Sequence, residues 1–191
     1  MRQSVQVIDD LDEAAEAMRR VIAGSSSGDG WNLPSPCAGW TVRDVINHVV
    51  TGNLRTLAWT NTDNGPPNED DYLGANPLGA FNASFREVRA RLAELPARDA
   101  AVQTPFAVLS ADRLIEMRCC ELAVHAWDVA RATSQSTDFA PEVCERVLVI
   151  ARTRMQGLDR AQGPFGAEQP SGPGASAADR LAAFLGRASG A

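Results

Sequence analysis

Apolar side chains recur at steps of three and four residues through most of this 191-residue chain. That spacing places them on one face of an α-helix, whereas a half-buried strand would alternate at every second residue. The pattern therefore predicts an all-α fold. Helices are expected over residues 9–24, from 41 past 57, and over 77–95, 111–133, 141–157 and 177–185.

Residues that favour helix ends stand at several of these boundaries. Thr41 and Asp44 match a capping box, in which the threonine hydroxyl accepts from a free backbone amide and the carboxylate favours the positive end of the helix. Pro141 suits a first helical turn, and Pro96 stops the pattern of the third predicted helix. These signals support the predicted helix limits.

The helix predicted over 111–133 differs from the others because it is apolar nearly all round. A helix without a polar face is expected in the middle of a bundle, where neighbouring helices cover every side. We therefore expect a four-helix bundle with extra short helices and long connecting loops. Residues 1–191 are expected to form a single domain, since the length suits one substantial core.

Three connections are rich in turn-forming residues. Residues 25–40 predict an irregular connection, and residues 61–76 predict a long, exposed loop of the kind that often shapes a cleft. Residues 97–109 could form two short strands around Pro105 or a plain loop, and we predict the loop.

The chain is 45% hydrophobic, carries a formal net charge of −6, and has its 18 Lys and Arg residues dispersed. Dispersed cations form no surface that could follow a phosphate backbone, so nucleic acid is not expected as a partner. No run reaches the roughly 18 apolar residues of a membrane span, and the N-terminus lacks a signal-peptide core, which favours a cytoplasmic protein with no membrane partner. The four cysteines lack C-x-x-C spacing and predict reduced, mostly buried thiols.

Histidine is scarce, because only His48 and His125 occur in the chain. His125 lies four residues after Glu121, so both side chains share one face of their predicted helix. That face is otherwise apolar, and burying a carboxylate and an imidazole unpaired costs several kcal/mol. A divalent ion such as Zn²⁺, Fe²⁺ or Ni²⁺ removes this cost, because it accepts both ligands from an i, i+4 pair.

A third ligand is needed, and His48 on the second predicted helix can supply it. His48, Glu121 and His125 are therefore the predicted metal ligands. They leave an open position of the kind that catalytic zinc sites keep for water. On a helical wheel His48 falls at the edge of the core near Gly52, which predicts a cleft open to solvent where the facing backbone comes close.

Simpler interpretations of the same residues stay open at this point. His48 could be a surface histidine, Glu121 could pair with the arginine three residues before it, and His125 could be a satisfied core residue. Asp128 could orient a ligand or act as a general base, but pairing with Arg131 is the simpler interpretation and the one we favour. The four tryptophans are interpreted as core and loop anchors and not as part of a site.

The sequence resembles the DinB-like, maleylpyruvate-isomerase N-terminal superfamily, whose members are four-helix metal-binding proteins common in actinobacteria. The likeness rests on the segments WNLPSPCAGW at 31–40, TVRDVINHV at 41–49 and ELAVHAWDVAR at 121–131. The segments at 163–166 and 179–187 also look like the ending of the family. The resemblance thus covers nearly the full length of the chain.

The resemblance implies a DinB-like bundle in which one histidine of the second helix and a glutamate and histidine of a later helix bind the metal. These positions match His48, Glu121 and His125. It further implies one divalent ion as cofactor, zinc first with nickel or iron as alternatives, and mycothiol or a related thiol as co-substrate. Known activities of the superfamily are thiol-dependent isomerisation and group transfer, in which a metal lowers the pKa of the thiol.

Three functions follow as hypotheses. The first is a metal- and thiol-dependent transferase or isomerase that acts on a small electrophilic molecule. The second is a non-catalytic, stress-related protein that binds a metal or a ligand, and the third is a structural bundle with an empty triad. The mycothiol-dependent isomerase carries a C-terminal domain that 191 residues are too few to contain, so maleylpyruvate is not the expected substrate. A homodimer is compatible with the expected fold.

Overall fold

A computed structural model describes residues 2–25, 29–61, 70–97, 99–160 and 165–188. Four long helices occupy the first two thirds of the chain: α1 (Arg2–Gly24), α2 (Val42–Thr60), α3 (Pro77–Ala93) and α4 (Ala111–Ala132). Two shorter helices follow, α5 (Pro141–Arg154) and α6 (Ala177–Phe184). A 3-10 turn, η1 (Gly30–Asn32), precedes α2.

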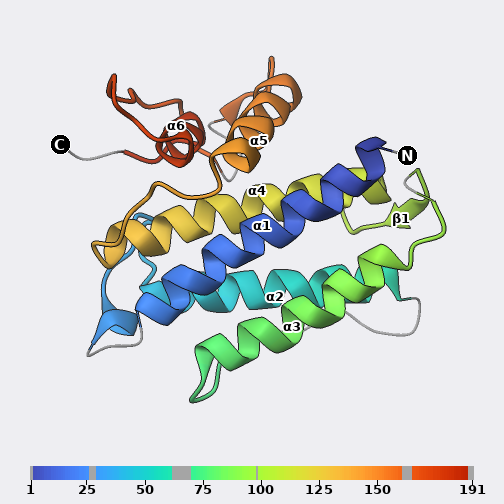
Figure 1. The fold of residues 1–191 in the computed structure, drawn as a ribbon, viewed down its shortest axis with the longest axis horizontal. Coiled ribbons are helices and arrows are strands. Elements are labelled where there is room, and N and C mark those ends of the chain that lie inside the picture. The colour runs from blue at the N-terminus through green and yellow to red at the C-terminus, as the bar shows by residue number, and fades with distance from the viewer. Residues whose placement is uncertain (1, 26–28, 62–69, 98, 161–164, 189–191) are drawn as a thin grey trace.

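The helices α1 to α4 form a four-helix bundle (Figure 1), in which α1 packs mainly on α4 and α2 packs on both α3 and α4. The helices α5 and α6 pack on each other and against the outer side of α4. The helix α4 therefore has neighbours on all sides, and 14 of its 22 residues are buried. This arrangement confirms the predicted all-α, DinB-like bundle with α4 at its centre.

The predicted helix starts agree with the side chains that cap them. The Thr41 hydroxyl accepts from the backbone N–H of Asp44 at 3.2 Å, and the Asp44 carboxylate accepts from the N–H of Thr41 at 2.8 Å. The Ser110 side chain caps α4, and Pro141 occupies the first turn of α5 as expected. Local sequence thus fixes where the two helices that carry the histidines and Glu121 begin.

Two predictions of secondary structure were wrong. The first helix begins at Arg2 and not at residue 9, because Val7 and Ile8 extend its apolar face onto the core before the acids that we took for a helix start. Residues 97–109 were predicted as a loop, but they contain an antiparallel pair of short strands, β1 (Ala101–Gln103) and β2 (Val108–Ser110). The Thr104 hydroxyl and the carbonyl of Ala107 close the turn between them at 2.6 Å.

The loop predicted over 61–76 is only partly exposed. Residues 62–69 lie outside the described residues, but Leu73 is 3% exposed and belongs to the core. Asn47 of α2 holds this segment, because its side chain bonds the carbonyl of Asp70 at 3.0 Å and the N–H of Tyr72 at 2.9 Å. Within the described part of the chain, none of the helices has both the length and the apolarity needed to cross a bilayer.

Candidate metal centre

The three predicted ligands come together where α2 faces α4. Nitrogen or oxygen atoms of His48, Glu121 and His125 all lie within 4.8 Å of one another. His48 Nε2 is 3.1 Å from Glu121 Oε1, and the two imidazole ring centres are 5.0 Å apart. Side chains 77 positions apart in the chain, such as His48 and His125, thus face a common point.

Gly52 lets α2 approach α4 at this point. It lies one helical turn after His48, and a Cβ atom placed on it would be 2.3 Å from Arg118 Nη1 and 2.9 Å from Glu121 Oε1. Any larger residue would therefore displace one of these side chains. The sequence predicted a close approach of the facing backbone at Gly52, whereas the structure places the side chains of Arg118 and Glu121 against it.

Glu121 has a different partner on each oxygen. Oε1 faces His48, whereas Oε2 accepts from Arg118, which is 3% exposed and also donates to Asn53 Oδ1 at 2.8 Å. Burial alone would raise the pKa of Glu121, but the charge of Arg118 and the hydrogen bond from His48 hold it at about 2. The carboxylate is therefore ionised. Glu121 pairs with Arg118, which was the alternative to its role as a metal ligand, and it contacts His48 at the same time.

His125 is oriented by Asp128, which is fully buried. His125 Nδ1 lies 2.9 Å from Asp128 Oδ2. Burial alone would raise the pKa of Asp128, but the hydrogen bond and charge of His125, together with the charge of Arg187, lower it below its usual value. An ionised acceptor at Nδ1 fixes the ring and leaves Nε2 with its lone pair for a metal.

The favoured pairing of Asp128 with Arg131 was wrong. Asp128 Oδ2 lies 3.2 Å from Arg187 Nη2, whereas the guanidinium of Arg131 lies over the ring of Trp127 at 5.8 Å from its centre. Three-residue spacing could not distinguish these outcomes, because Arg187 reaches Asp128 from a segment 59 positions away.

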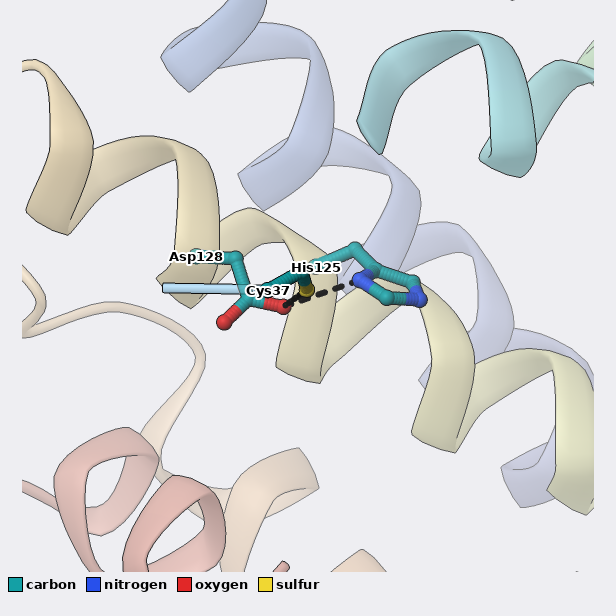
Figure 2. Close-up of side chains that lie close together, drawn as sticks. All are labelled: Cys37, His125 and Asp128. Atoms are coloured by element: carbon teal, nitrogen blue, oxygen red, sulfur yellow. Dashed lines mark hydrogen bonds and ion pairs between the residues drawn. The ribbon is translucent and has the colours of Figure 1, made fainter. Parts of the chain in front are cut away.

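Cys37 is the third group on Asp128. Figure 2 shows its sulfur beside the carboxylate, and Cys37 Sγ lies 3.1 Å from Asp128 Oδ2 and 3.5 Å from Arg187 Nη2. Burial, with the charge of Asp128 beside it, raises the pKa of Cys37 to about 12. Cys37 is therefore a neutral thiol that donates to Asp128. No sequence pattern assigned Cys37 or Arg187 to the site, since only the fold brings them together.

Trp40 also belongs to this site, contrary to our interpretation of the tryptophans as anchors alone. Its ring centre lies 5.0 Å from that of His48 and 6.5 Å from that of His125. It is held there because the segment before α2 folds back on itself, with the N–H of Ser35 bonded to the carbonyl of Trp40 at 2.8 Å. Trp40 therefore forms one wall beside the two imidazoles.

The site opens into a cavity of about 1140 Å³. His48, Glu121, His125 and Trp40 line one part of it, and much of the remaining wall is apolar. Contributors to this wall include Phe106, Met117, Val124, Val147, Ile150 and Phe165. A volume of this size accommodates an organic molecule beside the three ligands.

The donor set fits a divalent transition metal. Two imidazoles and one carboxylate are ligands that zinc, iron and nickel accept, and the acceptor on His125 Nδ1 is the second contact that metal-bound histidines usually make. Because Arg118 occupies Oε2 of Glu121, Oε1 is the oxygen left for a metal. The cavity beside the triad leaves room for a further ligand.

Comparison with known families agrees with this geometry. The family model of the mycothiol maleylpyruvate isomerase N-terminal domain matches residues 11–130. The chain belongs to this family. The matched region contains α2 and nearly all of α4, and therefore His48, Glu121 and His125. The resemblance stated from the sequence is thus confirmed.

Individual relatives extend the match. The chain is 36% identical over 155 residues to an uncharacterized protein found in two strains of Mycobacterium tuberculosis, with 81% of this chain and 83% of the relative covered. The crystal structure of the mycothiol-dependent maleylpyruvate isomerase matches with a TM-score of 0.57 at 20% identity. That match covers 75% of this chain and 66% of the isomerase, so the present chain spans about two thirds of that structure and shares its fold.

Proposed function

We propose that His48, Glu121 and His125 bind one divalent metal ion, with zinc as the first choice and nickel or iron as alternatives. The observation that carries this proposal is the approach of their donor atoms to within 4.8 Å at the wall of a large cavity. Two further features support it: Asp128 orients His125, and Arg118 keeps Glu121 ionised. Both features hold the ligands in the form that a metal requires.

We propose further that the protein is a metal- and thiol-dependent transferase or isomerase acting on a small electrophilic molecule. A divalent metal with an open position lowers the pKa of a thiol that binds it, which supplies a nucleophile at neutral pH. Trp40 and the apolar cavity wall lie beside the ligands and offer an organic molecule an apolar surface there. Membership of a family named for a mycothiol-dependent isomerase supports mycothiol or a related thiol as co-substrate.

The residues of this chain have separable roles in the proposal. His48, Glu121 and His125 bind the ion, Asp128 and Arg187 orient His125, and the neutral thiol of Cys37 donates to Asp128. Cys37 is not proposed as a nucleophile, because its raised pKa keeps it protonated at neutral pH.

Metal content is the first test. Protein purified without chelators and analysed by mass spectrometry is expected to hold about one equivalent of transition metal, as one three-ligand site predicts. His48→Ala and Glu121→Ala should lose most of it while remaining folded by circular dichroism. Glu94→Ala, which removes a carboxylate just beyond the end of α3, is the matched control and should retain the metal. Metal-free wild-type protein after reconstitution would contradict the proposal.

The second test separates catalysis from storage or sensing of metal. Conversion of maleylpyruvate and of a panel of other small electrophiles is followed in the presence and absence of mycothiol, with thiol consumption measured in parallel. Mycothiol- and metal-dependent conversion that His48→Ala abolishes would support the enzyme, and the thiol would be consumed in a transfer but regenerated in an isomerisation. Full metal occupancy with no mycothiol-dependent conversion of any electrophile would instead favour a non-catalytic metal-binding protein.

A further inference from the structure

The cavity beside the triad is elongated along α4. Residues of α4 that line it follow one helix face from Arg113 through Met117 and Val124 to His125. Twelve residues separate the first and last of these, which corresponds to about 18 Å at 1.5 Å per residue. The proposed metal ligands lie at one end of this path, and Arg113 lies at the other.

The helix α5 forms the opposite wall. Val147, Ile150, Ala151 and Arg154 line the cavity at the three- and four-residue spacing of one helix face. The end of α5 lies near the start of α4, because Arg154 Nη2 is 3.8 Å from Glu116 Oε2. The two helices thus face each other along the cavity.

The middle of the cavity is apolar and its far end is positive. Met117 and Ile150 lie between Glu121 and Arg154, and Val124 and Val147 line the wall beside the triad; these four side chains offer no hydrogen bond. An apolar molecule gains free energy by leaving water for such a wall, whereas a polar one loses hydrogen bonds.

At the far end, the guanidinium groups of Arg113 and Arg154 share a single carboxylate, that of Glu116. The distances to Glu116 Oε2 are 3.3 Å from Arg113 Nη1 and 3.8 Å from Arg154 Nη2, so neither contact is short. Two cations and one anion leave an excess positive charge at this end. A carboxylate from a ligand would complement it.

We propose that this cavity binds an amphipathic carboxylate, whose anionic group lies at Arg113 and Arg154 and whose apolar body extends along α4 toward Glu121. Eight residues separate Arg113 from Glu121, so the body spans about 12 Å. The inference names the substrate class of the proposed function and depends on that function only for the reaction at the metal end. The binding itself requires no metal.

Calorimetry on the full chain tests the binding with decanoate and with decanol, which shares the apolar chain but lacks the charge. Wild-type protein should bind decanoate more tightly than decanol. Ile150→Trp places an indole in the middle of the ligand path and should weaken the binding of decanoate and of decanol by about tenfold or more. Val149→Trp is the matched control, because Val149 is 63% exposed on the same helix and does not line the cavity.

The charged end has its own pair of variants. Arg154→Gln should weaken the binding of decanoate by about two- to fivefold, the range of a partly exposed ion pair. It should leave the affinity for decanol unchanged. Arg152→Gln, whose side chain pairs with Glu168 outside the cavity, should change neither. Wild-type protein that binds no decanoate, or equal effects of Ile150→Trp and Val149→Trp, would overturn the proposal.

Metal analysis of the same samples keeps the two proposals distinct. If Ile150→Trp retains the metal of the wild type and loses decanoate, the cavity is the ligand site and the metal site is intact. If the wild type binds decanoate in the expected way but holds no metal, the amphipathic ligand site stands and the proposed metal function fails. If the wild type holds the metal but binds no decanoate, the proposed metal site stands and the proposed amphipathic ligand site fails.

Discussion

His48 Nε2 lies 3.1 Å from Glu121 Oε1, so one polar contact joins α2 to α4 at the centre of the candidate site. Both atoms belong to the proposed donor set, and a metal between them would replace a single hydrogen bond by two coordinate bonds. The contact therefore brings one donor atom of each helix together, and binding of the proposed ion should stabilise the fold.

The first prediction concerns this stabilisation. Zinc at 100 times its dissociation constant should stabilise the folded protein by about 2.7 kcal/mol. For a chain of this size that corresponds to an increase of roughly 5–11 °C in Tm. His48→Ala should lose most of the increase, as measured by thermal melting followed by circular dichroism. Glu94→Ala should keep it, and an equal increase in His48→Ala would show that zinc binds elsewhere.

The second prediction concerns Asp128, which is fully buried between His125 and Arg187. Asp128→Asn leaves the half-enclosed guanidinium of Arg187 without its carboxylate and should lower the free energy of unfolding by about 3 kcal/mol. Because the acceptor that orients His125 also loses its charge, metal affinity should fall about 10- to 100-fold in competition with a chromogenic chelator.

The control for Asp128→Asn is Asp71→Asn. Asp71 pairs with Arg43 at 2.6 Å on the exposed surface, away from the cavity. Its substitution should cost less than about 1 kcal/mol and leave metal affinity unchanged. If Asp128→Asn kept the affinity of the wild type, Asp128 would have a structural role only.

Much of the fold was predictable because local signals agreed with tertiary packing. The N-cap residue Thr41 and the first-turn residue Pro141 mark helix starts in the sequence and in the structure alike. The continuous apolarity of residues 111–133 indicated a central helix, and α4 lies among four others. The hairpin of β1 and β2 was missed because strands of three residues leave too few positions to show an alternating pattern.

The candidate site was predictable only in part. Glu121 and His125 are four residues apart, so helical spacing placed them together, and His48 followed from the scarcity of histidine. Arg187 and Cys37 lie 150 positions apart and meet at Asp128 only after α6 has packed against α4. No periodicity connects such residues, so the groups that orient His125 could not be predicted from spacing.

The third prediction concerns Gly52. An alanine in a helix normally stabilises it by about 1 kcal/mol relative to glycine. At Gly52, however, the added Cβ would meet Arg118 Nη1 at 2.3 Å, and Arg118 cannot move freely because it is buried and bonded to Glu121 and Asn53. We expect Gly52→Ala to lower the free energy of unfolding by about 1–3 kcal/mol in a urea titration and to weaken metal binding.

A second glycine serves as the control for this substitution. A Cβ on Gly172 would have no other atom within 4 Å, and Gly172 is exposed. Gly172→Ala should therefore leave the urea midpoint and the metal affinity of the wild type unchanged. A stabilised Gly52→Ala protein with normal metal affinity would show that α2 does not need its close approach to α4.

The fourth prediction concerns acid stability and the carboxylate of Asp179, which caps α6. Asp179 accepts from Trp127 Nε1 at 2.7 Å and from the N–H of Ser176 at 3.1 Å. Burial alone would raise the pKa of Asp179, but the hydrogen bonds that its carboxylate accepts from Trp127 and Ser176 lower the pKa below its usual value. The ionised form is thus favoured in the folded protein, and its contribution to stability is present above the unfolded pKa of about 3.9.

Because the folded pKa is the lower one, this contribution is lost as the pH falls from about 4 through the folded value. Asp179→Asn keeps one oxygen acceptor and loses the charge and the second acceptor, so it should cost about 1 kcal/mol at pH 7. In urea titrations between pH 7 and pH 2, the difference from the wild type should shrink below about pH 4. Asp138 is exposed, so Asp138→Asn should have the same free energy of unfolding as the wild type at every pH. If the difference between Asp179→Asn and the wild type stayed constant with pH, the charge of Asp179 would not contribute to stability.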